Sequence, residues 1–135
     1  MRLEELNLRE RTEPPIIQRQ RRGGLAEQLV ANFLRDEGLD VVAMNLRLGA
    51  FELDIVARDG PLLIVVEVRS RGPGSWTSAF GSLDAAKRRR VRKAGQWLWD
   101  RRYRNDASVE RMRFDAASVT FTPEGPRIEY VRAAF

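Results

Sequence analysis

The feature that most constrains this chain is the stretch from Glu52 to Arg71, ELDIVARDGPLLIVVEVRSR. It reads as two strands joined by a tight turn, because Asp59-Gly60 is a strong hairpin signal. The second strand is an almost continuous apolar run, which predicts a central strand covered on both faces. Four charged residues interrupt strand faces that would otherwise be apolar and easily buried: Glu52, Asp54, Glu67 and Arg69.

Alternation of side chains along a strand groups these charges on common faces. Glu52 and Asp54 share one face of the first strand, and Glu67 and Arg69 share one face of the second. With Asp59-Gly60 as a two-residue turn, Glu52 lies opposite Glu67 and Asp54 lies diagonal to it. A three-residue loop without a bulge would place Asp54 and Glu67 on opposite faces, so this prediction depends on the register.

Two interpretations of the charged strands stay open. Carboxylates that converge at the end of buried strands repel each other unless a cation joins them, and hard oxygen ligands suit Mg²⁺ or Mn²⁺. Such an ion polarises a phosphodiester and generates hydroxide from bound water, which supplies hydrolysis without histidine. The alternative is a cross-strand salt-bridge cluster on a solvated face, because charge clusters do not always mark a functional site.

The composition narrows the chemistry and the partner. The chain has no cysteine and no histidine, which excludes disulfides, thiol nucleophiles, Cys/His zinc sites and imidazole catalysis. It carries 24 Lys and Arg against 19 Asp and Glu, a net charge of +5, and this balance favours nucleic acid. No apolar run approaches the ~20 residues of a membrane helix, and no secretory signal is visible, so we expect a cytoplasmic protein without membrane contact.

The remaining sequence predicts one domain over residues 18–135, preceded by a flexible leader over residues 1–17. Pro14 and Pro15 exclude a helix that runs through them. The pattern of helix, three strands, helix and two strands favours an α/β fold with a mixed sheet flanked by helices. The predicted elements are a helix at 18–37, strands at 39–48, 51–58 and 62–70, a helix at about 83–103, and strands at 112–121 and 127–131.

In the first predicted helix, Glu27 lies beside an apolar stripe that includes Leu25 and Leu29. Its position places the carboxylate on the flank of the stripe, where it could project toward a site. A solvated glutamate on the helix surface is the commoner outcome for this residue type.

The second predicted helix carries a dense run of cations. Ser82 is its expected N-cap, and the segment KRRRVRK from Lys87 to Lys93 follows. A charge run is usually a solvated helix face, but this one favours phosphate contacts with a strong salt dependence. The expected DNA contacts are Lys87, Arg88, Arg89, Arg90, Arg92 and Lys93.

These motifs, in this order, resemble the YraN family of predicted endonucleases, a bacterial branch of the restriction-endonuclease-like, PD-(D/E)XK superfamily. FELDIVARDG is similar to the family's GEIDLIA-x-DG, and VVEVRSR is similar to its FVEVKxR. AEQLVANFLRDEGLDVVAMNLR looks like its GE-led helix and N-x-R strand. Lys87 with the basic helix, RFDAASV and the terminal Ala-Phe also match, so the resemblance covers about residues 19 to 135.

The resemblance implies a restriction-endonuclease-like mixed β-sheet flanked by α-helices, and metal-dependent cleavage of DNA, including branched or recombining DNA. It makes Asp54 and Glu67 the ligands of Mg²⁺ or Mn²⁺ and puts Arg69 at the superfamily's lysine position. Glu27 and Glu52 match acidic positions that would support the metal or its water. Cutting both strands of a duplex would favour a two-fold homodimer.

The chain departs from the family pattern at Ala26 and Phe51, which replace glycines, and at Arg69, which replaces lysine. Arginine stays cationic but is bulkier, forked and effectively never deprotonated. It can therefore keep an electrostatic role and lose the positioning of water. Two functions stay open: a metal-dependent DNA endonuclease, and a nuclease-like DNA-binding module whose chemistry is impaired.

Overall fold

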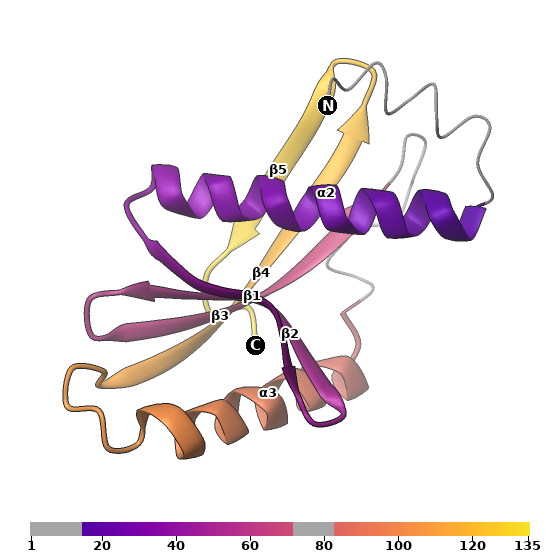
Figure 1. Ribbon diagram of the computed structural model, residues 1–135. Helices are drawn as coiled ribbons and strands as arrows, with labels where there is room; N and C mark the ends of the chain where they lie inside the picture. The colour runs from indigo at the N-terminus through magenta and orange to yellow at the C-terminus, as the bar shows by residue number, and fades with distance from the viewer. Residues whose placement is uncertain (1–14, 72–82) are drawn as a thin grey trace.

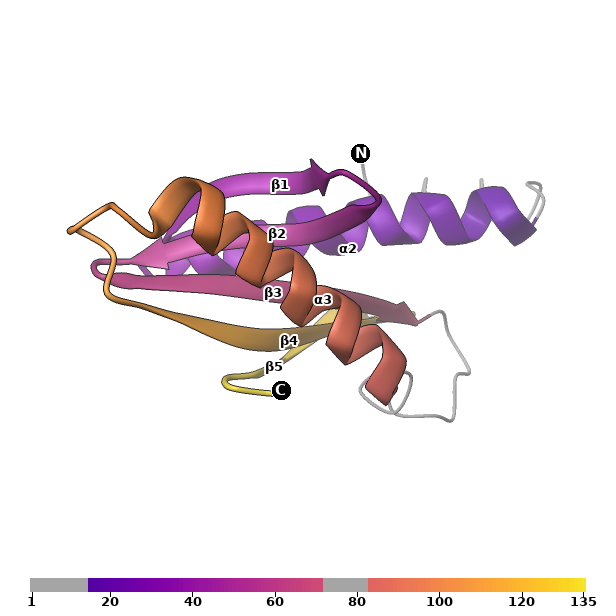
Figure 2. The same cartoon turned by 90° about the horizontal axis from the view of Figure 1, so that it is seen from below.

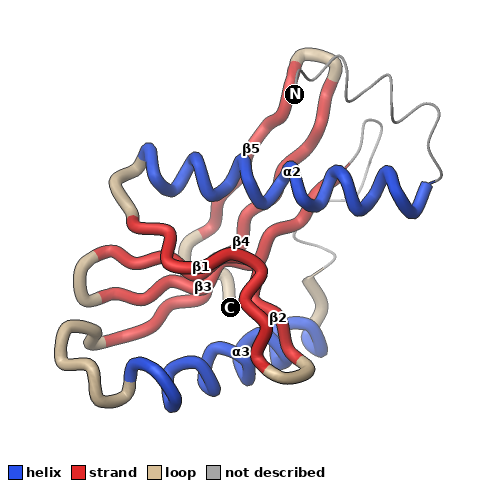
Figure 3. The backbone as a smooth tube through the Cα atoms, in the orientation of Figure 1, coloured by secondary structure: helices blue, strands red, loops and turns tan. Residues whose placement is uncertain are grey.

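The computed structural model describes residues 15–71 and 83–135. Figure 3 shows its helices and strands along the backbone. In chain order the elements are α2 (Pro15–Asp36), β1 (Asp40–Leu48), β2 (Phe51–Asp59), β3 (Leu62–Arg71), α3 (Ala85–Leu98), a π-helical turn η2 (Trp99–Tyr103), β4 (Arg111–Thr122) and β5 (Gly125–Val131).

The strands form one mixed sheet of five in the order β1-β2-β3-β4-β5. β3 and β4 are parallel, and every other neighbouring pair is antiparallel. α2 and α3 cover opposite faces of the sheet (Figures 1 and 2). The predicted α/β fold, a mixed sheet flanked by helices, is confirmed and is consistent with a restriction-endonuclease-like architecture. No helix in the described ranges is long and apolar enough to cross a membrane.

Each face of the sheet has its own apolar core. On one face, Val30 and Leu34 of α2 belong to a buried cluster with Ile64 of β3. On the other, Val91 and Leu98 of α3 belong to a second cluster that includes Leu63 and Val65 of β3, among other residues. Alternate residues of β3 thus serve both cores. This accounts for the continuous apolar run that predicted a doubly covered strand.

The first helix begins earlier than predicted and ends where a glycine allows it. α2 starts at Pro15 rather than Gln18, because proline lacks only an N–H that a first turn leaves unpaired anyway. Residues 15–17 therefore belong to the helix, and the rest of the predicted leader lies outside the described residues. At the other end Gly38 has a φ of +88°. Its N–H and that of Leu39 bond to carbonyls of the last turn, a Schellman cap.

The second helix is capped by Asp84, whose carboxylate accepts a 2.8 Å hydrogen bond from the N–H of Lys87. The predicted cap, Ser82, lies outside the described residues. The helical chain continues from α3 through η2 to Tyr103, the predicted end. Gly95 lets α3 approach β4 closely, because a Cβ there would lie 2.6 Å from the ring of Phe114.

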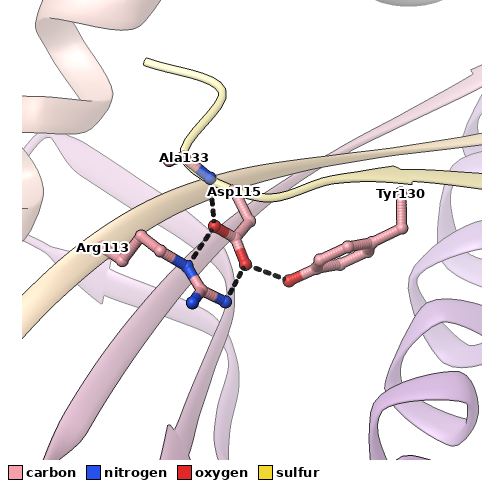
Figure 4. A network of polar contacts seen from close by, with 4 residues as sticks. All are labelled: Arg113, Asp115, Tyr130 and Ala133. Carbon is pink, nitrogen blue, oxygen red and sulfur yellow. Dashed lines mark hydrogen bonds and ion pairs between the residues drawn. The ribbon is translucent and has the colours of Figure 1, made fainter.

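A buried carboxylate joins β4, β5 and the C-terminal segment (Figure 4). Asp115 is fully buried. It accepts hydrogen bonds from Nε and Nη2 of Arg113, both at 2.8 Å, and from the hydroxyl of Tyr130 at 2.6 Å. The N–H of Ala133 donates a fourth bond at 2.8 Å. The charge of Asp115 is thus compensated on every side, as a buried charge requires.

We predict that Asp115→Asn destabilises the fold by about 1.5–3 kcal/mol, because it replaces a charged acceptor of four hydrogen bonds by a neutral amide in a fully buried position. Tyr130→Phe removes one neutral donor and should cost only about 1 kcal/mol. Urea unfolding of both variants measures the two values. Equal losses would show that the charge of Asp115 is not what the network depends on.

Candidate active site

The two faces of the β1–β2 hairpin exchange sides of the sheet along the length of the hairpin. Met44 and Ile55 are paired and pack with the core on the α2 side. Leu46 and Leu53 form another pair two residues further along, yet they pack with the core on the α3 side. In a regular ladder both pairs would face the same core, because side chains two apart share a face. The hairpin therefore reverses its faces between these pairs, and in Figure 1 it bends toward α3.

The reversal occurs at Asn45 on β1 and Asp54 on β2. Asn45 has a φ of +50°, a left-handed conformation that asparagine tolerates better than most residues. The paired residues of β2 and β3 end at Ile55 and Val66. Beyond that point the carboxylate of Asp54 accepts a 2.8 Å hydrogen bond from the N–H of Val68. Asp54 thus occupies the fork where β2 leaves β3.

The register of the β2–β3 hairpin differs from the prediction. Asp59 pairs with Leu62, so the two-residue turn is Gly60-Pro61 and the predicted Asp59-Gly60 turn is wrong. Gly60 has a φ of +58°, which suits the first position of such a turn, and proline's fixed negative φ suits the second. The predicted pairing of Glu52 with Glu67 depends on the Asp59-Gly60 turn and is therefore also wrong. In the observed register the residues that follow the last pair are Asp54 and Glu67, so these carboxylates lie beside each other.

The two carboxyl groups perturb each other. Burial, the charge of Glu67 and a hydrogen bond between the two side chains raise the pKa of Asp54 to about 7, although the Val68 N–H and the charge of Lys87 act in the opposite direction. Glu67 is only 2% exposed. The ammonium of Lys87 lies 3.3 Å from Oε1 of Glu67. Lys87 thus brings a positive charge to this buried pair of acidic side chains.

Two more predicted acidic residues gather around Asp54. Burial and the charges of Asp54 and Glu52 raise the pKa of Glu27 to about 7, and a hydrogen bond with the side chain of Asn45 offsets part of that rise. Glu27 reaches this place from α2, and Glu52 from the start of β2. The structure thus brings Glu27, Glu52, Asp54 and Glu67 into one acidic neighbourhood.

The cations divide between the site and the surface. Lys87, predicted as a DNA contact, lies against Glu67. Arg69 is half-buried, and its charge acts on Asp84: the pKa of Asp84 is lowered first by the N–H of Lys87 and further by the charges of Arg90 and Arg69. The remaining predicted DNA contacts are exposed along α3: Arg88, Arg89, Arg90, Arg92 and Lys93.

Two features of the site are not predicted by the sequence. Asn45 carries no predicted role, and its only signal is an asparagine inside an otherwise regular strand pattern. Lys87 is predicted as a DNA contact but not as a partner of Glu67, because nothing in KRRRVRK separates its first residue from the others. Its position near the start of α3, within reach of β3, becomes visible only in the folded chain.

The residues at the fork fit a hard divalent cation. Their donors are carboxylate oxygens, and a cation would relieve the repulsion that raises the pKa of Asp54. Among the described side chains, no group of three or more acidic residues is close enough to hold one metal ion. A metal here would therefore use Asp54 and Glu67 and complete its shell with water or substrate oxygens, as Mg²⁺ commonly does.

A wider cavity of about 580 Å³ lies elsewhere, between the C-terminal part of α2 and the end of β5. Arg113 and Tyr130 line it, but both already bond to the buried Asp115. These two polar groups thus have a structural role, and the acidic fork remains the better candidate for chemistry.

We predict that Asp54→Asn stabilises the metal-free protein at pH 8. A carboxyl whose pKa is higher in the folded than in the unfolded state costs stability as the pH rises from about 4 through 7, because the unfolded chain releases its proton first. Asparagine keeps an acceptor for the Val68 N–H and removes the charge. The gain should be roughly 2–4 kcal/mol at pH 8 and vanish near pH 4, as measured by denaturation in EDTA. A gain independent of pH would contradict the repulsion.

Comparison with known proteins gives a consistent answer. Residues 26–119 match the model of the uncharacterised protein family UPF0102. The UPF0102 protein sce2912 of Sorangium cellulosum is 51% identical over 114 residues, which is 84% of this chain and 79% of the relative. A UPF0102 protein of Nocardia farcinica is 39% identical over 84% of this chain and 87% of its own length. One from Acidothermus cellulolyticus is 36% identical over 84% and 92%. The chain therefore belongs to UPF0102, the YraN family.

Proposed function

We propose that this protein is a metal-dependent endonuclease that hydrolyses phosphodiester bonds of DNA. The observation that carries the proposal is the buried pair of Asp54 and Glu67, in which burial and the neighbouring carboxyl group raise the pKa of Asp54 to about 7 while Lys87 lies against Glu67. A buried carboxyl group with a strongly raised pKa and a specific charged partner is a recognised mark of functional sites. The fold and the family membership agree with the proposal without carrying it.

In this proposal Asp54 and Glu67 hold Mg²⁺ or Mn²⁺, which when bound activates water and polarises the phosphate. The protein's own contribution is position. The N–H of Val68 fixes one oxygen of Asp54 at 2.8 Å, and burial of Glu67 limits its motion. Glu27, with a pKa of about 7, can hold or release a proton near neutral pH, which suits a group that orients the attacking water.

The exposed cations of α3 are the proposed contacts to the DNA backbone. Five of them extend along the helix that also places Lys87 at the acidic pair: Arg88, Arg89, Arg90, Arg92 and Lys93. Such contacts bind without reading sequence and weaken steeply with salt. A substrate recognised by shape, such as branched or recombining DNA, suits this mode of binding. Cleavage of both strands would require two copies of the chain, related by a two-fold axis.

A second candidate is a DNA-binding module with impaired chemistry. Arg69 stands at the position where the superfamily pattern has lysine, and its charge acts on Asp84 at the N-cap of α3. An arginine engaged with a helix end would contribute less to the reacting atoms than a lysine at the acidic pair. DNA binding would then persist without cleavage.

We predict that the wild-type protein cleaves labelled duplex, flap or four-way-junction DNA with Mg²⁺ or Mn²⁺ and not with EDTA. Asp54→Ala should lower the rate at least about a hundredfold, because it removes a ligand of the ion that supplies the chemistry. Gel-based cleavage under single-turnover conditions measures the rate, and filter binding in Ca²⁺ checks that the variant still binds DNA.

The same assay separates the two candidates when Arg69→Lys is included. A silent wild type with an active Arg69→Lys variant would identify the binding module. If the wild type neither cleaves nor retains any of these DNAs at low salt, both candidates are wrong.

A further inference from the structure

A small cavity lies directly beside the acidic fork. Its volume is about 190 Å³, and it lies between the β1–β2 turn and the N-terminal half of α3. The two walls come from segments far apart in the chain, and the residues that line it are Ala50, Phe51, Glu52, Lys87, Arg90 and Val91.

The lining suits an anion. Lys87 and Arg90 are three residues apart on α3, so both side chains lie on the same face of the helix. Val91 is buried and packs this face against the sheet. The one acidic group in the lining is Glu52, which is exposed to solvent. Two cations and one carboxylate thus line the cavity, and one of the cations, Lys87, also contacts the buried Glu67.

The opposite wall is formed by the hairpin. Phe51 is half-buried and packs against the core on the α3 side, so its ring is held in place. Its side chain lines the cavity on the side of the β1–β2 turn. The cavity has a fixed apolar wall on one side and two cations on the other. This lining favours a compact anion with an organic substituent, such as a phosphodiester, over a small inorganic anion.

Lys87 joins this cavity to the acidic pair. Its side chain lines the cavity, and its ammonium lies 3.3 Å from Oε1 of the buried Glu67. The side chain of Lys87 remains 31% exposed, so the ammonium has room to contact an anion on the cavity side. An anion bound there would sit next to the carboxylates of the fork.

We propose that this cavity binds one backbone phosphate of DNA, with Lys87 and Arg90 as its cationic contacts. The identity of the ligand as DNA rests on the proposed function, but the binding of a phosphodiester does not require cleavage. Lys87 can contact Glu67 and a phosphate at once, because the ammonium of a lysine has three separate N–H groups.

The position of the other cations supports this assignment. Arg88 uses its Nε to bond the carbonyl of Leu83 at 2.9 Å. Arg92 and Lys93 are exposed and do not line the cavity. As proposed contacts to other phosphates of a long DNA, they test whether one phosphodiester binds in the cavity or anywhere along α3, since replacing either removes the same charge from the same helix without changing the cavity.

The test uses a dinucleotide with a single phosphodiester, TpT, titrated into the labelled protein and followed by amide chemical shifts. It is run in EDTA and again in Mg²⁺, at low salt. We expect saturable shifts at residues 50–52 and 87–91 in the wild type. Lys87→Ala and Arg90→Ala should each weaken TpT binding about tenfold, the usual effect of losing one charged contact. Lys93→Ala and Arg92→Ala should weaken it less than about threefold, through long-range charge alone.

Lys87→Ala also removes the ion pair between Lys87 and the buried Glu67, so its effect on binding has two causes. Arg90→Ala, at an exposed position, tests the cavity without disturbing Glu67. Shifts confined to other parts of α3, or equal weakening by all four substitutions, would overturn the proposal.

Cleavage assays separate this proposal from the proposed function. Lys87→Ala should lower the single-turnover rate at saturating DNA more than Arg69→Ala does, whereas Arg90→Ala should mainly raise the DNA concentration required for half-maximal rate. Metal-dependent cleavage without TpT binding in the cavity would refute the phosphate site and leave the endonuclease standing. TpT binding in the cavity without any cleavage would support the phosphate site and refute the endonuclease.

Discussion

The reversal of the β1–β2 hairpin at Asn45 and Asp54 is the constraint on which the site depends. In a regular ladder Asp54 would present its carboxylate to one face of the sheet, in reach of one helix only. The reversal sets Asp54 in the fork between β2 and β3 instead, where Glu27 arrives from α2 and Lys87 from α3. The left-handed backbone conformation of Asn45 costs free energy locally, and the rest of the hairpin holds the residue in that conformation.

Two buried acidic groups of the same chain differ in how their charges are compensated. Asp115 has an arginine, a tyrosine hydroxyl and a backbone N–H as donors, so its charge stabilises the junction of β4, β5 and the C-terminal segment. Asp54 has one backbone N–H and a second carboxyl group beside it. Such an arrangement weakens the metal-free fold, which agrees with our proposal that a cation joins the two carboxyl groups, because functional sites commonly reduce stability.

Much of this could be predicted from the sequence, and for identifiable reasons. The apolar run of β3 predicted its double coverage, and the juxtaposition of Asp54 with Glu67 survived a wrong turn because the register shifted by an even number of residues. The reversal at Asn45 could not be predicted, since strand periodicity assumes that alternation continues. The contact of Lys87 with Glu67 depends on the crossover from β3 to β4, which no local pattern in a run of cations reveals.

Our proposal requires that the fork bind a divalent cation through Asp54 and Glu67. This can be tested with a crystal soaked in Mn²⁺ and measured at the manganese absorption edge, because the anomalous signal locates the metal without any assumption about activity. We expect a peak at about 2.2 Å from a carboxylate oxygen of each residue, as is usual for oxygen ligands, and no peak in an Asp54→Ala crystal. A crystal that has taken up Mn²⁺ but shows no peak at the fork, with Lys87 still against Glu67, would contradict the proposal.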